Sequence, residues 1–330
     1  MHLLAGWIWV AFSAVVQVDA MSTRSSSILT RLQELDGSKH ASSYVGFMIN
    51  SHCVGQVHRE MLPLLLSHQE KLFDLQKTND DARSRERLHL LPTPTDDDHQ
   101  GLTAALDKAT QLLIDNKIIS RRHTDEYPVS TVEGTGKPTR LCHINRNASP
   151  YFGITSVGVH LLCWKKNPTL GLWMAQRSST KSHFPLLWDP TVAGGQPANL
   201  SLFDNMVKES HEEAGIHRDM LSKEDCHSVS CLSQMTSKPN GTCMKQSLYY
   251  CWELQVDANF VPVANDNEVS KFELWDSQTL LEEVKFGNRL RPAMRLVVTD
   301  FLIRHGIITP DNEPDYAKIQ TALHRDRLIL

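Results

Sequence analysis

The sequence lacks an excess of basic residues, a regular cysteine framework and any internal repeat. Its 330 residues include 34 Lys and Arg against 38 Asp and Glu, which gives a formal net charge of -4. A chain without a positive field is a poor partner for polyanions, so we expect no nucleic acid partner. The seven cysteines are odd in number and irregularly spaced, which argues against a disulfide scaffold of the secreted type.

The chain also lacks an apolar run of clear membrane-spanning length. Residues 3–18 are almost wholly apolar, but a transmembrane helix needs about 20 such residues. The run resembles the apolar region of a signal peptide, although no Lys or Arg precedes it, and Met21 offers a second start. We therefore favour an intracellular protein, cytoplasmic or mitochondrial, with no membrane attachment in the mature form. Secretion through residues 1–20 is the alternative.

What the sequence does contain is a globular composition, 41% hydrophobic and 22% charged, in a chain long enough for two domains. The polar, proline-broken stretch 79–100 predicts a loop. Hydrophobic patterning around it predicts strands and helices. Strands are expected at 44–49 and 54–58, an apolar helix through Leu64, Leu65 and Leu72, and a further helix at 102–113.

The second half of the chain predicts strands interrupted by one well-marked helix and closed by another. Strands are expected at 157–164, 171–177, 247–256 and 268–274, and the closing helix at 292–305. This order is typical of an α/β/α sandwich. We therefore predict an α/β protein in four parts. These are a leader at 1–20, an α+β module at 28–125, an α/β/α domain at 141–310 and a helical tail at 311–330.

The interrupting helix carries the most informative residues of the chain. Ser201 followed by Asp204 resembles a capping box, and Gly215 is a typical residue just past a helix end. Between them, Glu209, Glu212 and Glu213 fall at i, i+3 and i+4, so they share one helix face. Like charges this close repel one another unless a cation lies between them. A hard divalent ion such as Mg²⁺ prefers oxygen ligands of this kind.

A glutamate-rich helix face is usually only solvated, so the surrounding pattern decides the interpretation. From Gly194 to Ile216, the glycine, the loop, the basic residue and Glu-x-x-Glu-Glu-x-Gly resemble the Nudix box. The chain departs from the box where Leu200 replaces a glutamate, Lys208 replaces the usual arginine and Ser210 replaces an aliphatic residue. None of these changes removes one of the three glutamates.

Beyond the box, the chain is similar to the thiamin-pyrophosphokinase-related Nudix hydrolases of plants and fungi. The residues that carry this resemblance are Val45-Gly46-Phe47, Val54-Gly55-Gln56-Val57, Phe152-Gly153-Ile154, Gly158-Val159-His160, Trp188-Asp189, Val207-Lys208-Glu209 and the run from Asp300 to Ile308. The resemblance implies hydrolysis of thiamin diphosphate, or of its oxidised or damaged analogues, to the monophosphate. Departures at 185–187 and 196–199 put the substrate range in question more than the chemistry.

The resemblance also implies roles for individual residues. Glu209, Glu212 and Glu213, together with the carbonyl of Gly194, would hold Mg²⁺ or Mn²⁺, and Lys208 would orient the glutamates electrostatically. The general base would be Glu209 or Glu268, because relatives place a base on a late loop. A surface position is the alternative for Glu268.

Four residues are candidates for binding the small-molecule diphosphate. Arg122 and Gly195 are candidates for contact with the substrate, and Trp188 or Trp275 could stack on a flat heterocycle. Ordinary surface or core packing is the alternative for Arg122 and both tryptophans. Three other activities stay open: a pyrophosphatase for a nucleoside diphosphate derivative, a non-catalytic binding module and, least favoured, an isoprenoid diphosphate isomerase. The sequence predicts no oligomeric state.

Overall fold

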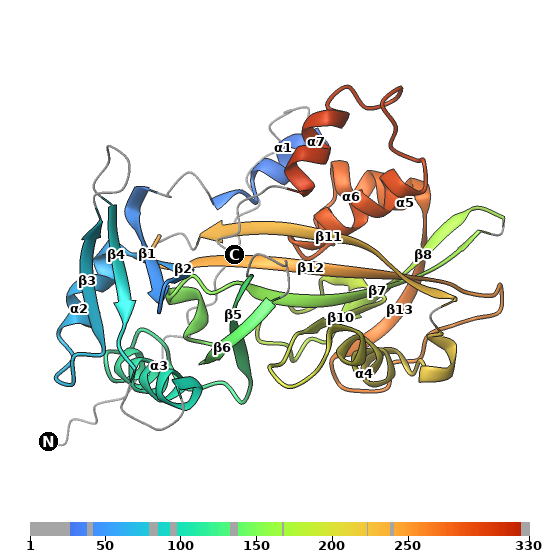
Figure 1. Ribbon diagram of the computed structural model, residues 1–330. Helices are drawn as coiled ribbons and strands as arrows, with labels where there is room; N and C mark the ends of the chain where they lie inside the picture. Colours follow the sequence, from blue (N-terminus) through green and yellow to red (C-terminus); the bar gives the residue numbers. More distant parts are fainter. Residues whose placement is uncertain are drawn as a thin grey trace, which may run out of the picture.

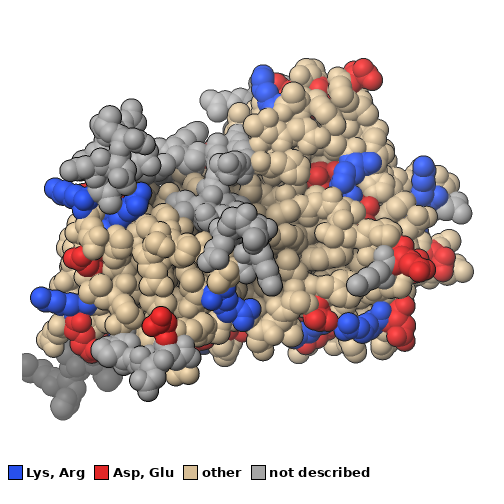
Figure 2. Space-filling model, viewed as in Figure 1, with Lys and Arg blue, Asp and Glu red and all other residues tan. Residues whose placement is uncertain are grey.

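A computed structural model describes residues 27–37, 42–78, 85–92, 98–132, 138–166, 168–222, 224–237 and 241–324. The leader predicted at residues 1–20 and the alternative start at Met21 lie outside the described residues. No helix of the described part is long and apolar enough to cross a membrane. On the face shown in Figure 2, basic and acidic side chains are interspersed, with no continuous field of one sign.

The first half of the chain is built around a four-stranded sheet of order β2-β1-β4-β3. Its strands are β1 (Tyr44–Ile49), β2 (His52–His58), β3 (Phe73–Thr78) and β4 (Arg85–Leu90), with the helices α2 (Leu62–Leu66) and α3 (Asp98–Asp115). A separate hairpin of β5 (Glu126–Val132) and β6 (Pro138–Asn145) follows. The aromatic centre of this half is Phe73, whose ring centroid lies 5.8 Å from that of Phe152, and the ring of Phe47 lies 5.1 Å from that of Phe152.

Two predictions for this half were wrong. The apolar helix does not run through Leu72, because α2 ends at Leu66 and strand β3 begins at Phe73. The predicted loop at 79–100 contains a strand, β4, which pairs with both β1 and β3. Only Leu88 and Leu90 of β4 are buried apolar side chains, so its sequence is too polar to signal a strand by itself. The predictions of β1 and α3 are confirmed.

The second half forms a seven-stranded sheet of order β11-β12-β7-β8-β13, in which β10 also pairs with β7 and β9 with β8. Its strands are β7 (Ser156–Lys166), β8 (Leu170–Arg177), β9 (Trp188–Pro190), β10 (Val192–Gly195), β11 (Cys226–Ser237), β12 (Met244–Gln255) and β13 (Val269–Asp276). The strands predicted at 157–164, 171–177, 247–256 and 268–274 correspond to β7, β8, β12 and β13. No strand was predicted from the sequence at the position of β11.

Helices cover both faces of this sheet (Figure 1). On one face lies α4 (Leu202–Ala214), and on the other lie α5 (Ser277–Lys285), α6 (Met294–Arg304), α1 (Ile28–Gln33) and α7 (Tyr316–Leu323). Each face has its own apolar core, one around Val159 and Met206 and the other around Leu162 and Phe301. The predicted α/β/α sandwich is therefore the observed architecture. Helix α1, although first in the described chain, packs with the C-terminal helices.

Two glycines bring the two halves of the chain together. Gln56 N donates to the carbonyl of Phe152 over 3.0 Å. A Cβ at Gly55 would lie 2.2 Å from that carbonyl oxygen, and one at Gly153 would lie 2.5 Å from Gln56 N. Gly153 also has a φ of +60°, which favours glycine. Larger residues at either position would separate β2 from the turn that leads into β7.

Candidate active site

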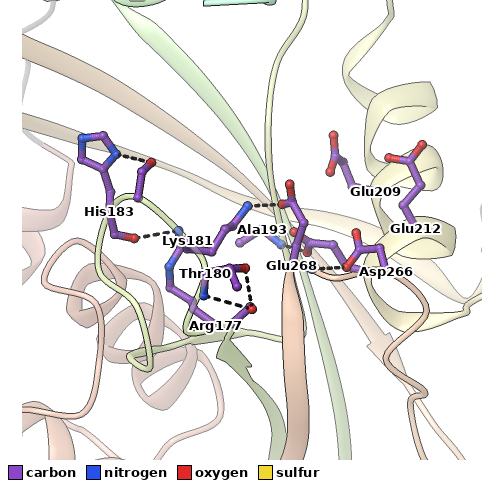
Figure 3. Close-up of polar contacts among 12 residues, drawn as sticks. Arg177, Thr180, Lys181, His183, Ala193, Glu209, Glu212, Asp266 and Glu268 are labelled. Atoms are coloured by element: carbon purple, nitrogen blue, oxygen red, sulfur yellow. Dashed lines mark hydrogen bonds and ion pairs between the residues drawn. The ribbon is translucent and has the colours of Figure 1, made fainter. Parts of the chain in front are cut away.

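Helix α4 begins and ends where its caps predict. Ser201 is the N-cap and its hydroxyl accepts from Asp204 N over 3.1 Å, while Gly215 ends the helix with a φ of 66°. Met206 and Val207 are buried against the sheet. Glu209 and Glu212 project from the helix in Figure 3, Glu209 beside strand β10 and Glu212 on the exposed side. The capping prediction is confirmed.

Gly194 brings strand β10 directly against the acidic face of α4. A Cβ at Gly194 would lie 2.2 Å from Glu209 Cγ, so only glycine allows Glu209 to occupy this position. Gly195 pairs with Gly158 of β7 and has more room, since a Cβ there would lie 3.6 Å from the Tyr127 hydroxyl. The structure therefore places Gly194 and Glu209 together, as the sequence predicted, and adds Tyr127 as a neighbour that the sequence did not suggest.

Glu213 is the most deeply buried of the three glutamates, with 7% of its surface exposed. Its carboxylate accepts a hydrogen bond from Ala193 N over 2.8 Å. Burial raises its pKa to about 8, and the nearby carboxylates of Glu209, Asp189 and Glu268 add to this. The pKa of Glu209 is also raised, first by burial and then by Glu212 and Glu268, against the opposing charge of Lys208. Without a cation, this cluster disfavours its own ionisation.

Lys208 supplies the positive charge closest to the cluster. Its Nζ lies 2.5 Å from Glu212 Oε2 and 3.5 Å from Glu209 Oε1. Burial lowers the pKa of Lys208, but its bonds to Glu212 and the charges of both glutamates outweigh burial and raise it overall. The residue thus lies where it can orient the glutamates, although its contact is with the carboxylates of its own helix.

The donor set is suited to a hard divalent cation, although the side chains do not yet converge on one point. Among the described residues, no three His, Cys, Asp or Glu side chains are placed to hold a metal ion. The contacts of Lys208 with Glu212 and Glu209 explain this arrangement. All the candidate donors are oxygen atoms, and the raised pKa of buried Glu213 reflects an unmet need for positive charge. The residues therefore fit Mg²⁺ or Mn²⁺, provided that Glu212 and Glu209 turn from Lys208.

Glu268 is brought to the site by the loop that leads into β13. This loop is held against the end of α4, where Val263 N donates to Ala214 O over 3.1 Å and Asn265 Nδ2 donates to His211 O over 3.0 Å. Glu268 N donates to Asp266 Oδ1 over 2.8 Å. Figure 3 shows Glu268 facing the loop after β8, where Lys181 is its ion-pair partner.

A small pocket lies between these elements. The residues that line it come from β8, the following loop, β9, β10, α4 and the start of β13: Ala175, Arg177, Lys181, Asp189, Ala193, Glu213, Glu268 and Val269. Glu213 and Glu268 therefore open onto a common space, although they are far apart in the sequence. Lys181 and Arg177 are lining residues that the sequence analysis missed.

Asp189 is a buried anion between two arginines. It accepts from Arg177 Nη1 over 2.8 Å and from Arg291 Nε over 2.5 Å, and 4% of its surface is exposed. Burial alone would raise the pKa of Asp189, but Arg291 and Arg177 hold it below its ordinary value. The Trp188-Asp189 pair in the family resemblance was the available signal for this residue. Neither Arg177 nor Arg291 had a signal in the sequence.

The other predicted substrate-binding residues lie elsewhere. Trp188 and Trp275 pack against each other in the core, with ring centroids 5.0 Å apart and no more than 5% of either surface exposed. Arg289 stacks over Trp275 at 4.1 Å. Arg122 donates to Asp107 of α3 over 2.7 Å and is not brought to the box. These are the positions of packing and surface residues, the alternative interpretation for all three.

Comparison with known proteins gives relatives along most of the chain. Residues 25–156 match a family described as a domain of unknown function, DUF4743. The chain is 29% identical to Nudix hydrolase 20, chloroplastic, of Arabidopsis thaliana over 88% of this chain and 75% of the relative. It is 27% identical to Nudix hydrolase 24, chloroplastic, of the same plant over 91% of this chain and 79% of the relative. An uncharacterized protein of Saccharomyces cerevisiae, YJR142W, is 30% identical over 55% of this chain and 56% of the relative.

Among solved structures, the chain resembles DR0079 from Deinococcus radiodurans, with 21% identity and a TM-score of 0.40 over 53% of this chain and 98% of that one. It also resembles the NUDIX domain of Shewanella oneidensis NrtR complexed with ADP ribose, with 13% identity and a TM-score of 0.37 over 47% and 90%. This chain is thus similar to Nudix hydrolases along most of its length, and its helix α4 presents Glu209, Glu212 and Glu213 beside Gly194. On these grounds, the chain is a hydrolase that resembles the Nudix family.

Proposed function

We propose that this hydrolase is a metal-dependent diphosphohydrolase that cleaves thiamin diphosphate, or its oxidised or damaged analogues, to the monophosphate. The observation that carries the diphosphatase part is the buried Glu213 carboxylate, which shares a pocket with Glu268 and lies beside Glu209. The resemblance to the thiamin-pyrophosphokinase-related branch supports the thiamin part. A role in repair of damaged metabolites follows if the oxidised analogues are the better substrates.

The proposed metal ligands are Glu209, Glu212 and Glu213, with the Gly194 carbonyl as a further oxygen donor. When bound, Mg²⁺ or Mn²⁺ would neutralise charge on the phosphoryl oxygens and polarise the attacking water. Lys208 keeps Glu212 and Glu209 on one side of α4 in the free protein. The close approach of Gly194 to Glu209 leaves no room for a further side chain between strand and helix.

The proton acceptor that the arrangement favours is Glu268. Its side chain is half exposed and lines the pocket, whereas Glu209 is packed against Gly194. The water oxygen forms a bond to phosphorus while the bridging P–O bond breaks with its electron pair. One water proton goes to the Glu268 carboxylate, and the two phosphate-bearing products leave. A carboxylate in this position needs no covalent intermediate.

An assay of the full chain tests the proposed function. Thiamin diphosphate, its oxidised analogues, ADP-ribose, NADH and 8-oxo-dGTP would each be incubated with Mg²⁺, Mn²⁺ or EDTA, and the phosphate-bearing products separated by chromatography. Metal-dependent formation of thiamin monophosphate compounds is the expected result. Turnover of a nucleotide alone would favour the nucleoside diphosphate alternative. Binding without turnover of any compound would favour the non-catalytic module.

The compartment belongs to the same proposal. Two relatives are named chloroplastic, which supports the expectation of an intracellular protein. Small-molecule partners alone are proposed. Imaging of the tagged full-length chain tests the compartment, and secretion into the medium would contradict it.

A further inference from the structure

The loop between β8 and β9 is held in a fixed conformation beside the pocket. Two non-glycine residues in it, Phe184 and Leu186, have φ values of 52° and 63°, in the left-handed region that side chains rarely adopt. Such residues persist only where their surroundings hold them. Here the Arg177 guanidinium donates to the carbonyls of Phe184 and His183 over 3.1 and 3.0 Å. The loop is therefore a built feature of the site.

Arg177 cannot turn toward a ligand without losing one of these bonds, because each of its three guanidinium nitrogens donates to the protein. Besides the two carbonyls, it donates to Asp189 over 2.8 Å. The other cation that lines the pocket is Lys181. Among the described residues, Lys181 Nζ bonds only to Glu268 Oε2 (Figure 3), and its side chain is 26% exposed. An ammonium group has three donors, so Lys181 keeps capacity for a further acceptor.

The charges around the pocket are mostly negative, and Lys181 can offset them for a bound diphosphate. The lining carboxylates are Asp189, Glu213 and Glu268, and Asp189 is already matched by two arginines. A diphosphate bound beside Glu213 would face the negative charge of Glu268, which lines the same pocket and is not a proposed metal ligand. Lys181 is the lining cation that can turn from a carboxylate to a phosphoryl oxygen. A charge-assisted bond of this kind is stronger than a neutral one.

We propose that Lys181 binds a phosphoryl oxygen of the substrate by exchanging its bond to Glu268 for one to the phosphate. The exchange leaves the Glu268 carboxylate free to accept the proton of the attacking water. In the free protein, the same bond keeps Glu268 next to the pocket. The charge of Lys181 also offsets the repulsion between the Glu268 and Glu213 carboxylates. Arg177 is then a positioning residue that fixes the loop. This inference rests on the proposed diphosphatase function and names a phosphate-binding residue for it.

Binding of methylenediphosphonate, a diphosphate analogue with an uncleavable P–C–P bridge, tests the assignment without turnover. Calorimetric titration would be done with Mg²⁺ on the full chain, on Lys181→Met and on Lys181→Arg. We expect Lys181→Met to weaken binding about 10- to 100-fold, as loss of a charge-assisted bond predicts. Lys181→Arg should recover part of the affinity. The matched control is Lys108→Met, which removes an exposed lysine paired with Glu70 in the first half of the chain and should leave binding unchanged.

Glu268→Gln separates phosphate binding from a purely structural ion pair. If Lys181 binds phosphate, this variant releases the lysine, so affinity for methylenediphosphonate should stay the same or rise while turnover falls. Equal weakening by Glu268→Gln and Lys181→Met would overturn the proposal, as would wild-type affinity in Lys181→Met. Failure of the unaltered chain to bind the analogue with Mg²⁺ or Mn²⁺ would instead overturn the diphosphatase function, and this inference with it.

Discussion

The backbone N–H of Ala193 donates to the Glu213 carboxylate over 2.8 Å. This contact joins strand β10 to helix α4. The Glu213 carboxylate that accepts the hydrogen bond is almost wholly buried. One backbone donor is little compensation for burying a negative charge. The site is therefore arranged around a group that a divalent cation would stabilise.

Glu213→Gln tests that arrangement directly. The amide oxygen can still accept from Ala193 N, so we expect the chain to fold and melt at or above the wild-type temperature. Loss of a metal-binding carboxylate should lower turnover by at least about 100-fold. Thermal melting and product chromatography measure the two effects. Glu70→Gln is the control, because it removes an exposed carboxylate paired with Lys108. Near-wild-type turnover in Glu213→Gln would remove Glu213 from the metal ligands.

The pH dependence of stability should carry the signature of Glu213. Its pKa rises from 4.5 to about 8 in the folded chain, so between these values the folded state keeps a proton that the unfolded state has lost. Stability therefore falls as pH rises through this window, by an amount on the order of 1–4 kcal/mol. Urea unfolding in EDTA at pH 5 and pH 8 measures the difference. The fall should be smaller in Glu213→Gln and smaller when Mg²⁺ replaces EDTA; identical slopes in both proteins would contradict the shift.

Gly194→Ala should displace Glu209. The new Cβ would lie 2.2 Å from Glu209 Cγ, so either the side chain or strand β10 must move. We expect a lower melting temperature and loss of metal-dependent turnover. Gly195→Ala is the matched control for stability, since its Cβ would only approach the Tyr127 hydroxyl at 3.6 Å. If Gly194→Ala melts like Gly195→Ala, the close contact of strand and helix is not required.

Asp189→Asn should be among the most destabilising changes near the site. It removes the buried charge that Arg177 and Arg291 share, and leaving buried cations without their partner costs about 3–5 kcal/mol. Denaturant unfolding measures this free energy. The exposed pair of Arg59 and Glu86 provides the comparison, because Glu86→Gln removes a solvent-screened ion pair and should cost far less. A similarly small effect of Asp189→Asn would show that the buried network contributes little to stability.

The features that sequence could predict are those encoded over short distances. Ser201 and Gly215 specify the two ends of α4 locally, and the shared face of the three glutamates follows from helical spacing. Strands β7 and β8 carry enough apolar residues to be recognised alone. The resemblance to a family supplied Gly194, which no propensity would have selected.

The features that escaped prediction depend on residues distant in the sequence. Lys181 and Glu268 are 87 positions apart, and Asp189 and Arg291 are 102 apart, so no local spacing signals either pair. Strand β4 is polar and becomes a strand only because β1 and β3 flank it. The tryptophans were candidates because of their chemistry, but burial against each other decides their role.

The packing of α1 against α7 has a consequence for folding during synthesis and for cleavage of the chain. Ile28, Leu29 and Leu32 belong to the same apolar core as Ile319 and Leu323. During synthesis the first helix must wait for its partner until nearly all of the described chain has emerged, which makes this closure a late step. A truncated chain starting after α1 would leave that apolar face uncovered and should aggregate. A single cleavage that removes the N-terminal sheet therefore also removes α1, and it exposes the apolar core that α1 covers beside α7.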